Sequence, residues 1–108
     1  MKIYLAGPMT GLPHFNRPAF DEAARRLRQE GHEVWSPAEF AGEVMNSTGD
    51  EEQAALAGFS IRQAMATQLR YICLNADAIA MLPGWENSGG CRTEWAVATR
   101  LKLKIIYL

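Results

Sequence analysis

The sequence has little cysteine, little histidine and almost no net charge. Its 108 residues include two cysteines, two histidines and a formal net charge of -1 at pH 7. Two cysteines, Cys73 and Cys91, are too few for a disulfide scaffold. We therefore expect the protein to be in a reducing compartment, the cytoplasm. The histidines show no metal-ligand pattern, so we expect neither a metal nor a cofactor. The near-neutral charge argues against binding to a nucleic-acid polymer.

Long hydrophobic runs and repeats are also missing. No apolar run approaches the roughly 20 residues of a membrane-spanning helix, so we expect no contact with a membrane. The apolar part of the N-terminus is too short for a signal peptide. A composition of 48% hydrophobic and 21% charged residues is typical of one globular domain over residues 1–108. Its core is small, and a shared oligomer interface would help to stabilise it.

Short apolar segments alternate with helical patterns along the chain. Strands are predicted at 2–6, 33–35, 78–82 and 104–108. Helices are predicted from Pro18 to a stop at Gly31, at 38–45, over 51–74 with a break at 58–60, and from 88–90 to 101. This alternation predicts an α/β fold, with a parallel sheet of four to five strands and helices on both faces. A strand order of 2-1-3-4 would bring the loops 7–17 and 83–90 to one crevice.

Two of the predicted helices carry more detailed expectations. In the first, Phe20, Ala23, Ala24 and Leu27 form the buried stripe, and Asn16 is a candidate N-cap. In the helix that ends near residue 74, the apolar stripe is expected at Ile61, Met65, Leu69, Ile72 and Cys73.

The stretch from Pro83 to Trp95 organises the rest of the sequence. A buried strand ends at a Pro-Gly turn, and a helix begins at Ser88-Gly89-Gly90. Serine is a good N-cap, and glycines allow a ligand to approach the backbone closely. Because a helix N-terminus carries free N–H groups and a positive dipole end, this loop is a candidate phosphate site. Glu94, in the first turns of the helix, would face the same loop.

Several side chains are candidates for chemistry, and each has an ordinary structural alternative. Glu94 can act as nucleophile or base, but a glutamate there often only complements the helix dipole. The hydroxyl of Tyr4 can reach a carboxylate across the crevice, although strand tyrosines are common. Trp85 can stack on a base or contact another subunit. Arg17, His14 and Arg92 are possible phosphate or substrate contacts, and more often simply solvated charges. We interpret Asp77 mainly as a turn or strand-start residue at the beginning of the third strand.

Nearly the whole chain, apart from about residues 41–60, resembles a known family. The matching segments are Ile3–Gly11 (IYLAGPMTG), Phe15–Phe20 (FNRPAF), Gly31–Val34 (GHEV), Ala76–Ile79 (ADAI) and Leu82–Glu94 (LPGWENSGGCRTE). They resemble DUF4406, a family of small, mostly phage and prophage proteins of uncharacterised function. That family is similar to the nucleoside 2-deoxyribosyltransferases and the 2′-deoxynucleoside 5′-phosphate N-hydrolases.

The resemblance implies a flavodoxin-like fold that cleaves the N-glycosidic bond of a nucleotide. By motif position, Glu94 is the nucleophile that forms a glycosyl ester, and Tyr4 orients it. The residue six positions before the glutamate is an aspartate in the transferases and a phosphate-binding serine in the hydrolases. Ser88 stands there in this sequence, which favours a nucleoside monophosphate as ligand and water as acceptor.

The remaining expectations concern the rest of the site and its assembly. The substrate would be held by the helix start, Ser88, Gly89 and Gly90, and by the first loop, Gly7, Pro8, Met9 and Thr10. Arg17 and Trp85 are assigned to the same substrate-binding set. The resemblance also implies a homodimer or larger homo-oligomer, because a neighbouring subunit often completes the site in the related enzymes.

One position departs from the related enzymes. They carry a further aspartate in the helix before the third strand, thought to assist the leaving base. The nearest match here is Gln68, and a glutamine cannot donate an acidic proton. Either another acid serves, such as Glu86 or one of Asp50, Glu51 and Glu52, or activity is weak or absent. The alternative function is therefore a non-catalytic module that binds or sequesters a nucleotide.

Overall fold

The computed structural model describes residues 1–39 and 61–108. Their strands are β1 (Lys2–Ala6), β2 (Glu33–Trp35), β3 (Ala78–Met81) and β4 (Lys104–Tyr107). The α-helices are α1 (Arg17–Gln29), α4 (Ile61–Leu74) and α5 (Gly89–Arg100), and the two 3-10 helices are η1 (Pro13–Asn16) and η2 (Trp85–Asn87). What was predicted for residues 40–60 lies outside the described residues.

The four described strands form one parallel sheet in the order β2-β1-β3-β4. Ile3 on β1 pairs with Val34 on one side and with Ala78 on the other, and Ala78 in turn pairs with Lys104. The predicted α/β fold and strand order are confirmed, and the arrangement is flavodoxin-like. Because the order reverses between β1 and β3, the loops that follow these two strands meet at the same edge of the sheet.

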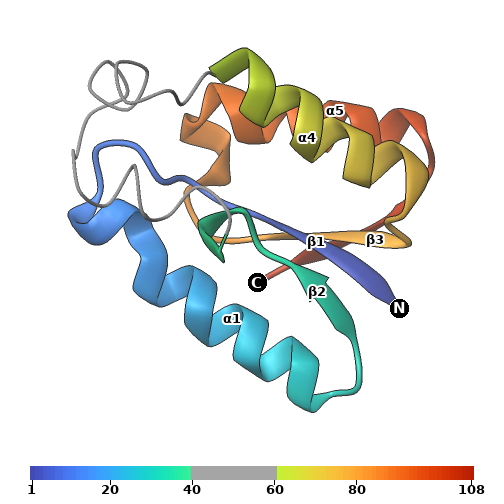
Figure 1. The fold of residues 1–108 in the computed structure, drawn as a ribbon, viewed down its shortest axis with the longest axis horizontal. Helices are drawn as coiled ribbons and strands as arrows, with labels where there is room; N and C mark the ends of the chain where they lie inside the picture. The colour runs from blue at the N-terminus through green and yellow to red at the C-terminus, as the bar shows by residue number, and fades with distance from the viewer. Residues whose placement is uncertain (40–60) are drawn as a thin grey trace.

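Helices cover both faces of the sheet, α1 on one side and α4 with α5 on the other (Figure 1). Successive side chains of a strand point to opposite faces, so β1 and β3 contribute to two separate cores. The core under α1 contains Ile3, Leu5, Ala78 and Ala80 of the strands with Phe20, Ala23, Ala24 and Leu27 of α1. The core under α4 and α5 contains Tyr4, Ala6, Ile79 and Met81 with Ile72, Cys91 and Ala98.

The ends of α1 agree with the sequence except at the cap. All four predicted apolar positions are buried, and Gly31 follows the helix with a φ of +93°, a conformation that favours glycine. Asn16 occupies the N-cap position, but its side chain does not cap the helix. Its Nδ2 instead donates to the carbonyl oxygen of Pro8 at 3.0 Å. Asn16 therefore ties the start of α1 to the loop after β1.

The predicted apolar stripe of α4 is only partly correct. Ile72 is fully buried, and Met65 and Leu69 are half-buried, as the helical spacing predicted. Cys73, however, is exposed. It directly follows Ile72, and adjacent positions on a helix lie about 100° apart, so the thiol turns out of the core.

The loop after β1 packs tightly against the chain that leaves β3. The backbone N–H of Leu82 donates to the carbonyl oxygen of Ala6 at 2.8 Å, which continues the β1–β3 pairing by one residue. A Cβ placed on Gly7 would lie 2.7 Å from Cδ1 and 2.8 Å from Cβ of Leu82. Gly7 is therefore required by close contact between the two loops that meet at the sheet edge.

We predict that Gly7→Ala destabilises the fold by about 1–3 kcal/mol, because Leu82 Cβ is fixed to the backbone and cannot rotate away. Urea unfolding followed by circular dichroism measures the change. Gly89→Ala is the matched control, since a Cβ at Gly89 meets nothing within 4 Å and alanine favours a helix. A Gly7→Ala protein as stable as the wild type would show that the two loops separate without cost.

Candidate functional site

Ser88 caps the N-terminus of α5, as the sequence predicted. Ser88 has extended backbone, and its Oγ accepts a hydrogen bond from the N–H of Cys91 at 3.3 Å. The turn before it is set by Gly84, whose φ of +88° favours glycine. First-turn N–H groups of a helix have no partner within the helix, so Gly89 and Gly90 present donors suited to an anion.

A cavity of about 620 Å³ opens beside this helix start, a volume suited to a small-molecule ligand. It lies at the carboxyl ends of β1 and β3, where parallel α/β sheets bind ligands. The loop after β1, the loop after β3, α4 and α5 all contribute to its wall. Its lining residues are Tyr4, Gly7, Pro8, Met9, Thr10, Leu12, Pro37, Ala64, Met65, Gln68, Pro83, Gly84, Asn87, Ser88, Gly89, Gly90, Cys91 and Glu94.

Glu94 is a buried carboxylate in the wall of this cavity. Only 4% of its surface is exposed, and Tyr4 Oη donates a hydrogen bond to its Oε2. Burial raises the pKa of Glu94 to about 7, and the hydrogen bond from Tyr4 opposes this rise. A glutamate that only complemented the helix dipole would be expected to be exposed to solvent. The side chain of Glu94 instead lies inside, where its two protonation states are close in energy at neutral pH.

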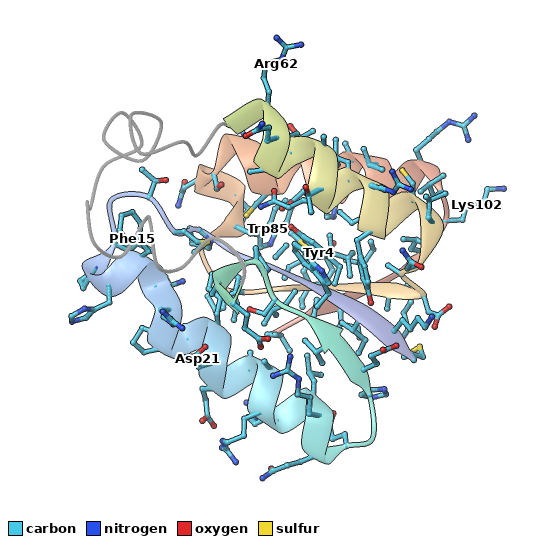
Figure 2. All side chains as sticks on the ribbon, viewed as in Figure 1. Tyr4, Phe15, Asp21, Arg62, Trp85 and Lys102 are labelled. Atoms are coloured by element: carbon cyan, nitrogen blue, oxygen red, sulfur yellow. The ribbon has the colours of Figure 1, made fainter. Side chains whose placement is uncertain are left out.

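Tyr4 is fixed in place by the aromatic side chains around it. It is fully buried, its ring stacks on Trp35 with centroids 5.2 Å apart, and Tyr71 lies 6.3 Å away. Figure 2 shows Tyr4 between the sheet and the pair of helices α4 and α5. Burial, and then the nearby charge of Glu94, hold the pKa of Tyr4 well above its usual range. Tyr4 is therefore a neutral, well-oriented donor to the carboxylate.

Cys91 is a member of the site that the sequence did not single out. It is 3% exposed, lines the cavity and lies one helical turn before Glu94. Burial raises the pKa of its thiol to about 11. The thiol is thus neutral at physiological pH and a poor nucleophile. Its spacing of three residues from Glu94 on one helix was the available signal for its position.

Most of the predicted site residues meet at the cavity. Glu94 and Tyr4 lie in its wall with Gly7, Pro8, Met9 and Thr10 of the first loop and Ser88, Gly89 and Gly90 of the helix start. A Cβ built on Gly84 would come within 3.4 Å of Pro8 Cγ, so the two predicted loops do approach each other. The fold rule for parallel sheets therefore located the crevice correctly.

Two predicted residues are not brought to the cavity. Arg17 lies on α1, where its Nε is 3.7 Å from Oδ2 of Asp21. Trp85 stacks on Trp95, with ring centroids 5.6 Å apart, and it packs against the core under α4 and α5. Neither residue belongs to the cavity lining, so the structure gives no support to a phosphate contact by Arg17 or to base stacking on Trp85.

The other polar candidates also lie elsewhere. His14, Glu86 and Arg92 are exposed and outside the cavity lining. Asp77 accepts a hydrogen bond from the N–H of Lys2 at 2.8 Å, at the opposite end of the strands from the cavity. This confirms that Asp77 organises the start of β3 and does not face the cavity.

Of the α4 residues that line the cavity, the sequence analysis connected Gln68 with the site but not Ala64 or Met65. Ala64, Met65 and Gln68 line the cavity, and a Cβ on Gly90 would lie 4.0 Å from Cε of Met65. Gln68 is half-buried and supplies the polar group of this wall. Asn87 joins Ser88 as a polar group on the opposite side. The i, i+1, i+4 spacing of the three α4 residues is typical of one helix face.

One known family matches almost the whole chain. The family model described as "Domain of unknown function (DUF4406)" matches residues 1–107. The chain belongs to this family. Among curated proteins no match was found. Within residues 1–39 and 61–108 of this DUF4406 protein, no group of three or more metal-ligating side chains occurs. In the same ranges, no helix is long and apolar enough to cross a bilayer.

We predict that Glu94→Gln stabilises the protein above pH 7 and has little effect at pH 4. Between about pH 4.5 and 7 the folded wild type binds more protons than the unfolded chain, because the folded pKa of Glu94 is raised. Its stability therefore falls as pH rises through this window, by up to about 3 kcal/mol. Glutamine cannot ionise and avoids this loss.

Urea unfolding of both proteins at pH 4 and pH 8 measures this difference. Glu86→Gln is the matched control, because Glu86 is an exposed glutamate outside the cavity. It is expected to change the free energy of unfolding by no more than about 0.5 kcal/mol at either pH. Equal stabilities of Glu94→Gln and wild type at pH 8 would mean that ionised Glu94 is well solvated or paired in the folded protein.

Proposed function

We propose that this DUF4406 protein hydrolyses the N-glycosidic bond between base and sugar of a (deoxy)nucleoside 5′-monophosphate. The carrying observation is the buried carboxylate of Glu94, held by Tyr4 in a cavity that also contains the capped start of α5. The resemblance of the Ser88–Glu94 segment to the nucleotide N-hydrolases supports the same reaction class. A carboxylate suits this chemistry because it stabilises and traps an oxocarbenium-like centre.

The spacing along α5 supports a sugar phosphate as the bound group. Ser88 and Glu94 are six residues apart, which corresponds to about 9 Å along a helix axis. A 5′-phosphate on the N–H groups at Ser88–Gly90 would thus leave the anomeric carbon in the direction of the carboxylate. The cavity of about 620 Å³ is large enough for a nucleotide.

In the proposed reaction, an oxygen of Glu94 bonds to the anomeric carbon as the bond to the base breaks. The electron pair of that bond leaves with the base. Water then attacks the anomeric carbon, Glu94 departs as a carboxylate, and the sugar phosphate is released. The proton that the attacking water loses balances the one that the departed base takes up from solvent. Tyr4 touches Glu94 and acts as a positioning residue that keeps one carboxylate oxygen in a fixed direction.

We predict that the purified protein releases free base from nucleoside monophosphates and that Glu94→Gln abolishes this release. Nucleotide binding by the variant should persist, because the phosphate contacts lie at the other end of the site. In the wild type, kcat/KM should rise with pH through about 7, since the ionised form of Glu94 is the nucleophile. Chromatography of reactions with deoxy- and ribonucleoside monophosphates measures base release.

Glu86→Gln, which alters an exposed glutamate outside the cavity, is the control for that assay. Retained turnover in Glu94→Gln would remove Glu94 from the mechanism. Release from free nucleosides but not from monophosphates would contradict the phosphate part of the proposal and retain the glycosidase part.

We also predict that Ser88→Asp weakens monophosphate binding by about tenfold or more, equivalent to about 1.4 kcal/mol. Aspartate is as good an N-cap as serine, so α5 should still form, but its charge repels a phosphate. Ser88→Asn is the matched neutral N-cap control and should bind the monophosphate more tightly than Ser88→Asp does. Titration calorimetry with a monophosphate and its nucleoside measures both; an equal effect on the two ligands would place the phosphate elsewhere.

A second candidate function is a non-catalytic module that binds or sequesters a nucleotide. The observation that favours it is Gln68, a neutral amide in the α4 wall where the related enzymes carry an acid. Tight nucleotide binding without base release would support this alternative.

We also propose, from the resemblance and the cysteine content, that the protein acts in the cytoplasm as a homodimer or larger homo-oligomer.

A further inference from the structure

The described lining of the cavity holds one carboxyl group, Glu94, and no lysine, arginine or histidine. The sequence of residues 40–60, which the structure does not describe, contains no basic residue either. A bound nucleotide would thus meet neutral donors at its phosphate and a carboxylate near its sugar. Among the described lining residues, no side chain supplies a positive charge that would balance the phosphate and the carboxylate, so a ligand that carries its own positive charge fits this lining best.

The charge balance of the departing base also depends on the groups that line the cavity. When the glycosidic bond of an uncharged base breaks, the ring nitrogen leaves with a negative charge unless an acid protonates it. A positioned general acid is worth roughly 10²- to 10⁴-fold in rate. In the α4 wall the available polar group is the carboxamide of Gln68, which has no acidic proton. Among the described lining residues, Glu94 is the one carboxyl group, so we expect neutral bases to be poor leaving groups in this lining.

We propose that the substrate is a nucleoside monophosphate whose base is cationic before cleavage, such as an N7-alkylated purine or a pyridinium N-linked to the sugar. This inference rests on the proposed function and names its substrate class. The bond from Glu94 to the anomeric carbon forms as the bond to nitrogen breaks. The electron pair neutralises the ring, so the base leaves uncharged and needs no proton. Hydrolysis of the ester by water then releases one proton to solvent.

The electrostatics of the cavity favour such a ligand in two ways. A cationic ring beside Glu94 is attracted by the carboxylate and stabilises its ionised, nucleophilic form. The positive ring also offsets part of the phosphate charge, which the described lining meets only with neutral donors such as Ser88 and Asn87. A monophosphate with an uncharged base would add negative charge to a site that already contains a buried acid.

The test compares guanosine 5′-monophosphate with its 7-methyl derivative, which differs by one methyl group and one positive charge. Both are supplied as ribo and 2′-deoxy forms, and blanks without protein correct for spontaneous base loss. We expect the methylated nucleotide to bind at least about fivefold more tightly and to be cleaved at least about 100-fold faster. In Glu94→Gln the binding preference should disappear, because the carboxylate charge that attracts the ring is gone.

The glycosidic bond of a 7-methylated purine nucleotide is intrinsically labile. A second variant therefore tests the inference on the unmodified nucleotide, which lacks this lability. Gln68→Glu places an acid in the α4 wall and should raise cleavage of unmodified guanosine monophosphate by about 10-fold or more. It should not raise cleavage of the 7-methyl compound, whose base needs no proton. Nicotinamide mononucleotide serves as a second cationic probe and should behave like the methylated purine.

Controls address the other carboxyl groups of the chain. Glu86→Gln and a variant with Glu43, Asp50, Glu51 and Glu52 changed to their amides should leave the preference for the cationic base unchanged. Loss of activity specific to uncharged bases in either variant would identify a general acid and overturn the inference.

The two proposals fail in different ways. Cleavage and binding of guanosine monophosphate as good as those of its 7-methyl derivative would overturn the cationic substrate and leave the glycosidase function standing. Absence of base release from every nucleotide and nucleoside tested would overturn both. Release of bases that persists in Glu94→Gln would remove the nucleophile on which both depend.

Discussion

The hydrogen bond from Tyr4 to Glu94 is the interaction on which the site depends. It joins the first strand to the last helix across 90 positions of sequence, inside the core beneath α4 and α5. Ionising a buried carboxyl group is costly unless a donor compensates it. Tyr4 supplies one such donor, and its buried ring is packed against Trp35, which restricts its orientation. Correct formation of β1, α5 and the aromatic cluster is therefore required before the carboxylate can face the cavity.

The fold was predictable because its signals are local. Short apolar segments separated by turn residues define the strands, and the 3.6-residue period of Phe20, Ala23, Ala24 and Leu27 defines α1. Serine followed by two glycines marks the start of α5. The strand order follows from general rules for parallel sheets, and that order is enough to bring the two loops together.

The environment of each side chain was less predictable, because packing between distant elements decides it. A glutamate in the first turns of a helix looks the same in sequence whether it is exposed or, like Glu94, buried. Trp85 was a candidate for base stacking, but its ring stacks on Trp95, ten residues later in the chain. Asn16 had the chemistry of a cap, but the carbonyl of Pro8 lay within its reach. In each case the competing partner comes from another element.

The burial of Glu94 also links stability to function. Burial raises the pKa of this group to about 7, so the same surroundings that hold Glu94 in place disfavour its ionised form, which the proposed mechanism uses. A salt bridge to a nearby lysine or arginine would remove this penalty, but it would also occupy the carboxylate and reduce its reactivity. The described lining of the cavity contains no such cation. A positively charged group placed beside Glu94 would offset the cost of its ionisation, and for this reason the proposed cationic base suits this buried carboxylate better than a neutral one.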